Sequence, residues 1–127
     1  MTEAPAPNET ELTLLKSFWR LGPLSAREVH EALGKDFAWA PSTTRTVLER
    51  MRGKGLLTRR SVHGMAVYAP AGDKVSVLGA ALNRLMRSVL EVRGELPASA
   101  FAGSEILSEA ELAELHDLLN AGPESKA

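Results

Sequence analysis

The feature that most limits the possible folds is a series of three short amphipathic patterns with clear starts and stops, followed by a β-forming stretch. The first pattern covers about residues 9–20, with Asn8 as N-cap, Glu11 at N3 and Gly22-Pro23 as its stop. Its expected apolar face consists of Leu12, Leu15, Phe18 and Trp19. This spacing predicts an amphipathic helix.

The second and third patterns predict two more short helices. Ser25 and Glu28 form a capping box at the start of the second, which we expect to end at Gly34. Its expected buried residues are Val29, Ala32 and Leu33. The third begins at Pro41, whose missing N–H costs nothing in a first turn, and runs to about Arg52. Its expected inward side consists of Thr44, Val47, Leu48 and Met51.

The next segment, residues 56–68, is rich in β-forming residues and is interrupted by His63-Gly64, which predicts a two-stranded hairpin with a short turn. Three short helices and a basic hairpin are typical of a winged helix-turn-helix. We therefore expect a mostly α fold with a small β-hairpin wing, followed by a helical dimerisation region. The expected bounds are residues 9–71 and 72–121, with disordered tails at residues 1–8 and 122–127.

The second region is expected to hold a long helix over about residues 74–92 and a final helix after the capping box that begins at Ser108. Between them, residues 97–106 could hold one helical turn around Phe101. Two helices make a poor core alone, so we expect a homodimer; the alternative is that they pack only on each other within one chain. The predicted dimerisation residues are Leu78, Leu82, Leu85, Val89, Val92, Leu112, Leu115 and Leu119.

Composition removes several function classes. The chain has no cysteine, which excludes disulfides, thiolate metal sites and cysteine nucleophiles. His30, His63 and His116 lack metal-ligand spacing and are expected to be surface residues. No nucleophile or paired-carboxylate motif is present, so we expect neither an enzyme nor a cofactor. No stretch is apolar enough for membrane insertion, and we expect a cytoplasmic protein.

Charge is unevenly distributed. Residues 41–60 carry six basic side chains and one acidic side chain, whereas residues 91–127 carry eight acidic and two basic ones. A basic middle suits a polyanion, and double-stranded DNA is the expected partner. The acidic end would be repelled by DNA and would face away from it.

The third helix is the expected recognition helix, because its outward positions carry hydroxyls and cations that can reach bases and phosphates. Arg45 is long enough for a bidentate contact with guanine. The alternatives are that these residues are ordinary polar surface and that charges on the hairpin protect an exposed edge strand. The predicted DNA-binding residues are Ser42, Thr43, Arg45, Thr46, Glu49, Arg50, Lys54, Arg59, Arg60 and His63.

The run from Trp39 to Leu56, WAPSTTRTVLERMRGKGL, resembles the penicillinase repressor family, the BlaI/MecI-type winged-helix repressors. It is similar to that family's pattern of Trp, Pro, two spaced Thr, Arg and a Lys-Gly pair. The segment from Leu12 to Trp19 and Tyr68 also fit, and the similarity in organisation extends over about residues 9–120. Thr44 stands where the family usually has an aliphatic residue.

The resemblance implies repression by dimers at a pseudo-palindromic operator, with a C-terminal three-helix dimerisation region. It also implies release by a regulatory protease, near Ala100 and Phe101 in this chain, where family members tend to have Asn before Phe. The family's copper-responsive branch uses C-terminal cysteines, which this chain lacks. The rival hypothesis is a winged-helix protein-interaction module without sequence-specific DNA binding, whose binding would depend weakly on salt.

Overall fold

The structure is a computed structural model that describes residues 7–121. The chain divides into two compact units, Met1–Gly72 and Asp73–Ala127. Of the two predicted disordered tails, only Pro7 and Asn8 fall within the described residues. None of the helices in residues 7–121 is long and apolar enough to cross a membrane.

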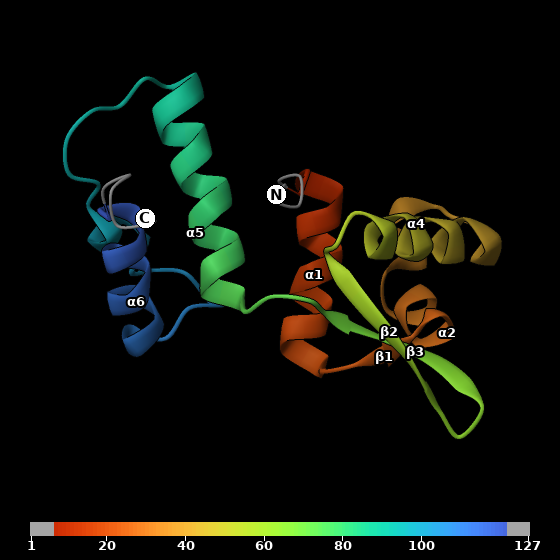
Figure 1. The fold of residues 1–127 in the computed structure, drawn as a ribbon. Helices are drawn as coiled ribbons and strands as arrows, with labels where there is room; N and C mark the ends of the chain where they lie inside the picture. The colour runs from red at the N-terminus through yellow and green to blue at the C-terminus, as the bar shows by residue number, and fades with distance from the viewer. Residues whose placement is uncertain (1–6, 122–127) are drawn as a thin grey trace. The chain divides into compact units, whose positions relative to one another are not determined.

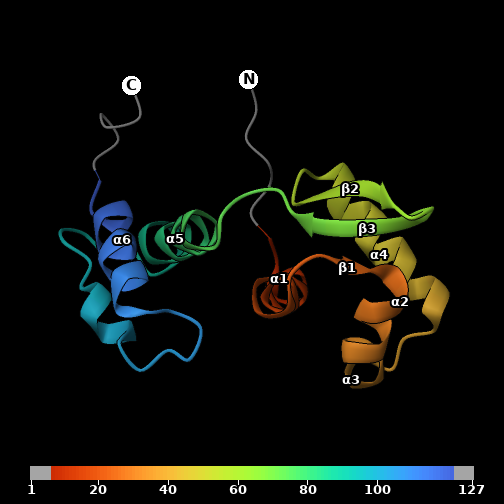
Figure 2. The same ribbon diagram turned by 90° about the horizontal axis from the view of Figure 1, so that it is seen from below.

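The first unit combines helices with a small antiparallel sheet, and it is a winged helix-turn-helix (Figure 1). Its elements are α1 (Glu9–Leu21), β1 (Leu24–Ser25), α2 (Ala26–Val29), the π-helical turn η1 (His30–Gly34), α3 (Lys35–Phe37), α4 (Pro41–Gly53), β2 (Leu57–Val62) and β3 (Met65–Pro70). The strand order is β1-β3-β2, and Figure 2 shows β3 between the other two. We call the β2–β3 hairpin, residues 57–70, the wing.

Local sequence signals produce these elements as expected. Asn8 and Glu11 form the capping box of α1, and Ser25 and Glu28 form that of α2. At the tip of the wing, His63 and Gly64 both have positive φ, 51° and 77°. A type I′ turn requires this pair of conformations, and it suits the twist of the hairpin. The predicted hairpin and its turn are confirmed.

The core of the first unit lies between α1, α4 and the sheet. Its most buried apolar side chains are Leu14, Leu15, Phe18, Val29, Leu48, Met51, Leu57 and Tyr68. On α1 the buried face differs from the expected one, because Leu14 is fully buried whereas Leu12 and Trp19 are only half-buried. The buried stripe of α1 is therefore centred on Leu14, Leu15 and Phe18.

Two expectations about the second helix were wrong. Helical geometry continues past Gly34 through η1 into α3, and it ends where Ala38 adopts a left-handed conformation, φ 57°. Gly34 is helical and buried, and Ala32 is exposed. The sequence also gave no sign of β1, because two residues are too few to show the alternation that marks a strand.

The second unit consists of α5 (Lys74–Arg84), the π-helical turn η2 (Leu85–Val89), the 3-10 helix η3 (Ala98–Phe101) and α6 (Glu109–Leu119). The helix expected to reach Val92 ends at Val89, whereas the short turn at Phe101 is confirmed. The buried core consists of Val75, Leu96, Ala98, Leu115 and Leu119. Packed against it are Leu82, Met86, Val92, Phe101 and Leu107.

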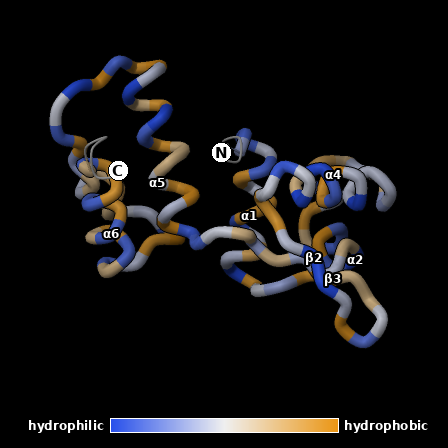
Figure 3. The backbone as a smooth tube through the Cα atoms, in the orientation of Figure 1, coloured by the Kyte–Doolittle hydropathy of each residue, from blue (hydrophilic) through white to orange (hydrophobic). Residues whose placement is uncertain are grey.

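The predicted dimerisation residues fall into three groups by burial. Leu82, Val92, Leu115 and Leu119 belong to the core of a single chain, and Leu78 and Leu112 are half-buried. Leu85 and Val89, at 46% and 66% exposure, are open to solvent. Figure 3 shows that apolar stretches continue beyond α5 into the segment that follows it, where Leu90 is also exposed.

Candidate nucleic-acid interface

The candidate interface is built around α4, which presents one face to the core and the other to solvent. Thr44, Leu48 and Met51 are buried, and their packing fixes the rotation of α4 about its axis relative to the rest of the first unit. Pro41 occupies the first turn. The opposite face carries exposed side chains that can donate hydrogen bonds or carry positive charge: Ser42, Thr43, Arg45, Thr46 and Arg50.

The two helices of the helix-turn-helix are linked by a polar contact between a half-buried and a buried side chain. Nδ1 of His30 lies 2.8 Å from Oγ1 of Thr44. Thr44 is almost completely buried and His30 is half-buried, so the expectation that His30 is a surface residue was wrong. The hydroxyl of Thr44 therefore has a hydrogen-bond partner on η1, which explains how a polar residue is accommodated at an inward position of α4.

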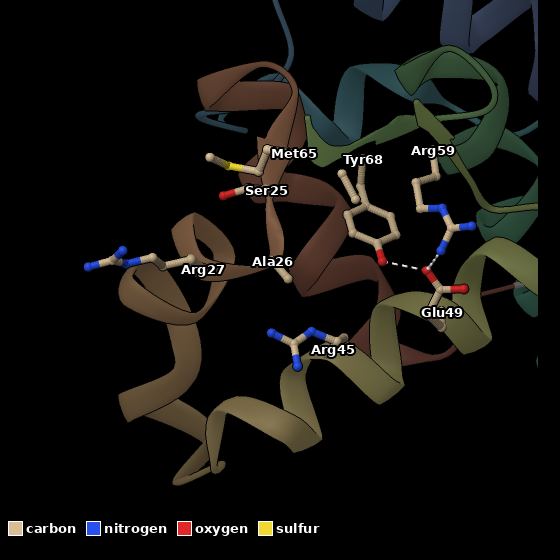
Figure 4. A pocket seen from close by; sticks show the side chains of 9 residues that line it. Ser25, Ala26, Arg27, Arg45, Glu49, Arg59, Met65 and Tyr68 are labelled. Atoms are coloured by element: carbon tan, nitrogen blue, oxygen red, sulfur yellow. Dashed lines mark hydrogen bonds and ion pairs between the residues drawn. The ribbon is translucent and has the colours of Figure 1, made fainter. Parts of the chain in front are cut away.

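Glu49 faces the wing and takes part in a network of hydrogen bonds and ion pairs (Figure 4). Its Oε2 accepts a hydrogen bond from the Tyr68 hydroxyl on β3 and one from Nη1 of Arg59 on β2, at 2.6 Å. Its Oε1 accepts from Nε and Nη2 of Arg52, at 3.0 and 2.8 Å. The Tyr68 hydrogen bond, followed by that of Arg52, lowers the pKa of Glu49 from 4.5 to about 2.

Lys54, another predicted DNA-binding residue, is engaged with α1. Its Nζ lies 2.6 Å from Oε2 of Glu11, whose side chain is only 6% exposed. Oε1 of the same carboxylate accepts the Asn8 backbone N–H in the capping box. Lys54 therefore neutralises a buried carboxylate, and its contact joins the end of α4 to the start of α1.

The wing places its predicted residues differently. Arg60 lies on β2 and His63 at the turn, and both are exposed. Arg59 is exposed as well, but one of its N–H groups is tied to Glu49. Arg45, Arg50 and Arg60 form no ion pair within residues 7–121, so these guanidinium groups are available to an anionic partner.

An open pocket of about 400 Å³ lies between α2, α4 and the wing. Figure 4 shows Arg59 and Tyr68 pointing toward Glu49, whereas Arg45 points away from that network toward the α2 side of the pocket. Arg27 of α2 also lines the pocket, and its Nε lies 3.5 Å from the exposed Glu31 carboxylate. Arg27 is not among the predicted site residues, because nothing in its local pattern distinguishes it from other exposed arginines.

The chemistry of this surface is that of anion recognition. Hydroxyls near the start of a helix and arginines along it can hydrogen-bond to phosphates and base edges. The part of the chain that the structure describes holds no cluster of three or more His, Asp or Glu residues that could bind a metal. The exposed hydroxyls and arginines of α4 suit this surface to contact with a nucleic acid.

The chain is similar to known proteins both in sequence and in fold. Over 74 residues the chain is 31% identical to a penicillinase repressor of Bacillus licheniformis, a match that covers 58% of this chain and 58% of that protein. The solution structure of the DNA binding domain of the repressor BlaI superposes with a TM-score of 0.50 at 31% identity. That superposition covers 58% of this chain and 90% of the domain.

The model of the family described as "Penicillinase repressor" matches residues 8–121, a range that extends over most of both compact units. The match is therefore not confined to the winged helix but extends through α5 and α6. On this evidence, the chain belongs to the penicillinase repressor family.

Proposed function

We propose that the protein is a DNA-binding transcriptional repressor that acts as a homodimer on a pseudo-palindromic operator. The observation that carries the proposal is the solvent face of α4, where Arg45 and Arg50 are free of ion pairs within residues 7–121. The free Arg60 of the wing extends this basic surface. The chain would be a cytoplasmic regulatory protein and not an enzyme.

In this function, α4 enters the major groove and the wing lies along the duplex. Ser42 and Thr43 are near the start of α4, where hydroxyls can donate to phosphate, and Arg45 lies one residue beyond the buried Thr44. Arg45 therefore reads a base edge in the proposal, and Arg50 and Arg60 contact phosphate. Lys54, which neutralises Glu11, supports the position of α4.

Dimerisation would align two copies of α4 with two operator half-sites. The support for a dimer is the group of exposed apolar side chains around the end of α5 and on α6. The group consists of Leu85, Val89, Leu90 and Leu118. Exposed leucines and valines gathered in one unit lose their contact with water when a second copy covers them.

The proposal includes release from DNA by a regulatory protease that cleaves near Ala100 and Phe101. Ala100 is exposed, and the two residues lie in η3, between the parts of the chain that form α5 and α6. Phe101 packs against the core formed by Val75, Leu115 and others, so cleavage here would weaken the core of the proposed dimerisation unit.

The test is a fluorescence anisotropy titration of the purified chain with duplex DNA from upstream of its own gene, with random duplex as competitor. We expect binding that survives the competitor and weakens with salt, with a log-log slope of about −0.9 per neutralised phosphate. Binding that barely responds to salt and does not distinguish the two duplexes would favour the protein-interaction module instead.

A further inference from the structure

The Glu49 network connects the recognition helix to both strands of the wing. Arg59 and Tyr68 are directly opposite each other in the β2–β3 ladder, so their side chains leave the same face of the sheet. Both reach the same oxygen of Glu49, one turn of α4 beyond Arg45. A single carboxylate thus makes contact with α4, β2 and β3.

A carboxylate at this place is unfavourable for DNA affinity taken alone. It adds a negative charge beside Arg45 and Arg50, and it occupies one N–H of Arg59 that could otherwise reach a phosphate. A neutral residue here would leave a more basic surface. The benefit must therefore lie in geometry, because charge-assisted hydrogen bonds from two strands hold their donors in one orientation.

Orientation matters for the readout of sequence more than for attraction to phosphate. Phosphate attraction acts over several ångströms and tolerates small displacements, whereas hydrogen bonds to base edges require donor and acceptor within about 3 Å. A wing that moves relative to α4 could still bind DNA, but it would no longer help to hold Arg45 in register with a base.

We propose that Glu49 is a positioning residue that fixes the wing against α4 through Arg59 and Tyr68, and that it raises discrimination between DNA sequences while lowering total affinity. This inference rests on the proposed DNA-binding function. It also reassigns Glu49, which the sequence suggested as a direct DNA contact, to a role exerted through its neighbours.

The experiment measures the dissociation constants of the full chain for two duplexes. One is a duplex selected by the wild-type protein from a random-sequence library, and the other is a scrambled duplex of the same composition. The test variant is Glu49→Gln, which keeps the size of the side chain and removes its charge. The matched control is Glu31→Gln, which removes a charge from the same unit at an exposed residue whose ion pair with Arg27 stays within one helical segment.

For Glu49→Gln we expect tighter binding to the scrambled duplex, because a repulsive charge is gone, together with weaker binding to the selected duplex. The ratio of the two constants should fall by about tenfold, within the range found for coupled residues. For Glu31→Gln the ratio should stay as in the wild type. If Glu49→Gln strengthens binding to both duplexes equally, the carboxylate is only a repulsive charge and the inference is overturned.

A second variant separates positioning from charge and from folding. Tyr68→Phe removes one hydrogen bond to Glu49 and changes no charge, and the ring can still fill its buried site. We expect it to lower the discrimination ratio with no change in the salt slope. Unfolding midpoints of both variants show whether they are folded under assay conditions, and an unchanged ratio in folded Tyr68→Phe would contradict the inference.

The proposed function itself fails in a different way. A wild-type protein that yields no enriched duplex, or that binds both duplexes with the same constant, is not a sequence-specific repressor. A wild-type protein that discriminates, combined with a Glu49→Gln variant that discriminates equally well, retains the proposed function and loses only the positioning role.

Discussion

Arg45 and Arg60 carry the same charge but stand on different elements, and this difference gives them different expected roles. Arg45 lies on the outward face of α4 near its start, whereas Arg60 lies on a strand of the wing. Neither forms an ion pair within residues 7–121. A base contact and a phosphate contact can be told apart by how a substitution affects different DNA sequences.

We expect Arg45→Ala to weaken operator binding by about 1 to 3 kcal/mol and to relax the preference at one base position. Arg60→Ala should weaken binding by about the same factor for every DNA sequence, and it should reduce the magnitude of the salt slope by about 0.9. Anisotropy titrations on a set of duplexes with single base-pair changes distinguish the two. A uniform loss for Arg45→Ala would show that Arg45 contacts only phosphate.

Lys54 is a cation that we expect to contribute to the stability of the fold through its ion pair with Glu11. Lys54→Met would leave the buried Glu11 carboxylate without its cationic partner, and we expect the free energy of unfolding to fall by about 2 kcal/mol. The control is Arg50→Met, which removes an exposed cation from the same helix and should leave stability unchanged. Urea unfolding measures both. Equal stability of the two variants would argue against the Glu11 pair.

The lowered pKa of Glu49 predicts that the free energy of unfolding depends on pH in the acid range. Its pKa is about 2 in the folded chain, below the ordinary value of 4.5, so the folded state binds this proton less readily than the unfolded state. The resulting stabilisation is complete above about pH 4.5 and is lost as the pH falls toward 2. The difference in unfolding free energy between wild type and Glu49→Gln should therefore shrink over this range, in urea titrations at several pH values. A difference that does not change with pH would contradict the Glu49 network.

At the scale of elements, the π-helical turn η1 shows how one glycine shapes the helix-turn-helix. A Cβ on Gly34 would lie 2.3 Å from Nδ1 of His30, which is too close for any real contact. The same nitrogen lies within hydrogen-bond distance of Thr44 on α4. Gly34 therefore provides the space in which the His30 ring can connect the two helices.

We expect Gly34→Ala to displace the His30 ring, break its contact with Thr44 and lower the free energy of unfolding by about 1 to 3 kcal/mol. Gly53→Ala is the matched control, because an added Cβ at the end of α4 has no atom within 4 Å apart from its chain neighbours and the backbone of its own helix. It should be neutral or stabilise the chain by up to about 1 kcal/mol. Thermal unfolding of both variants tests this, and equal effects would mean that the His30 contact is unimportant.

At the scale of the whole molecule, the second unit has both a core of its own and apolar residues left exposed. Leu115 is almost fully buried among Val75, Leu96 and Leu119, whereas Leu85 is 46% exposed. Arg87 strengthens the unit internally by donating hydrogen bonds to the Gly94 and Leu119 carbonyls. In the proposed dimer, folding of each chain and association of the two chains would depend on different leucines.

Leu85→Asp should abolish the proposed dimer and leave the chain folded, because it places a charge in the association surface and not in the core. Leu115→Asp should unfold the second unit, because the charge would be buried within one chain. Sedimentation and circular dichroism separate the two outcomes. A Leu85→Asp variant that still sediments as a dimer would show that the association surface lies elsewhere.

The sequence predicted those parts of the fold that depend on neighbouring residues. The three capping boxes at Asn8, Ser25 and Ser108 bridge three positions each, and His63-Gly64 fixes its own turn. The winged-helix class followed from the order of these elements. The strand β1 could not be predicted, because its two residues become a strand only through pairing with β3.

The tertiary structure alone decided which charged side chains of the candidate interface are free. Glu49 meets Arg59 and Tyr68 from ten and nineteen positions away, and Lys54 meets Glu11 from forty-three positions away. In sequence these residues look like any solvated acid or base beside Arg45. Turns and caps are set by interactions over three or four residues, whereas ion pairs between elements form only after the chain has packed. The sequence by itself therefore determined the helices and the hairpin, and the tertiary structure decided which charged side chains remain free of ion pairs.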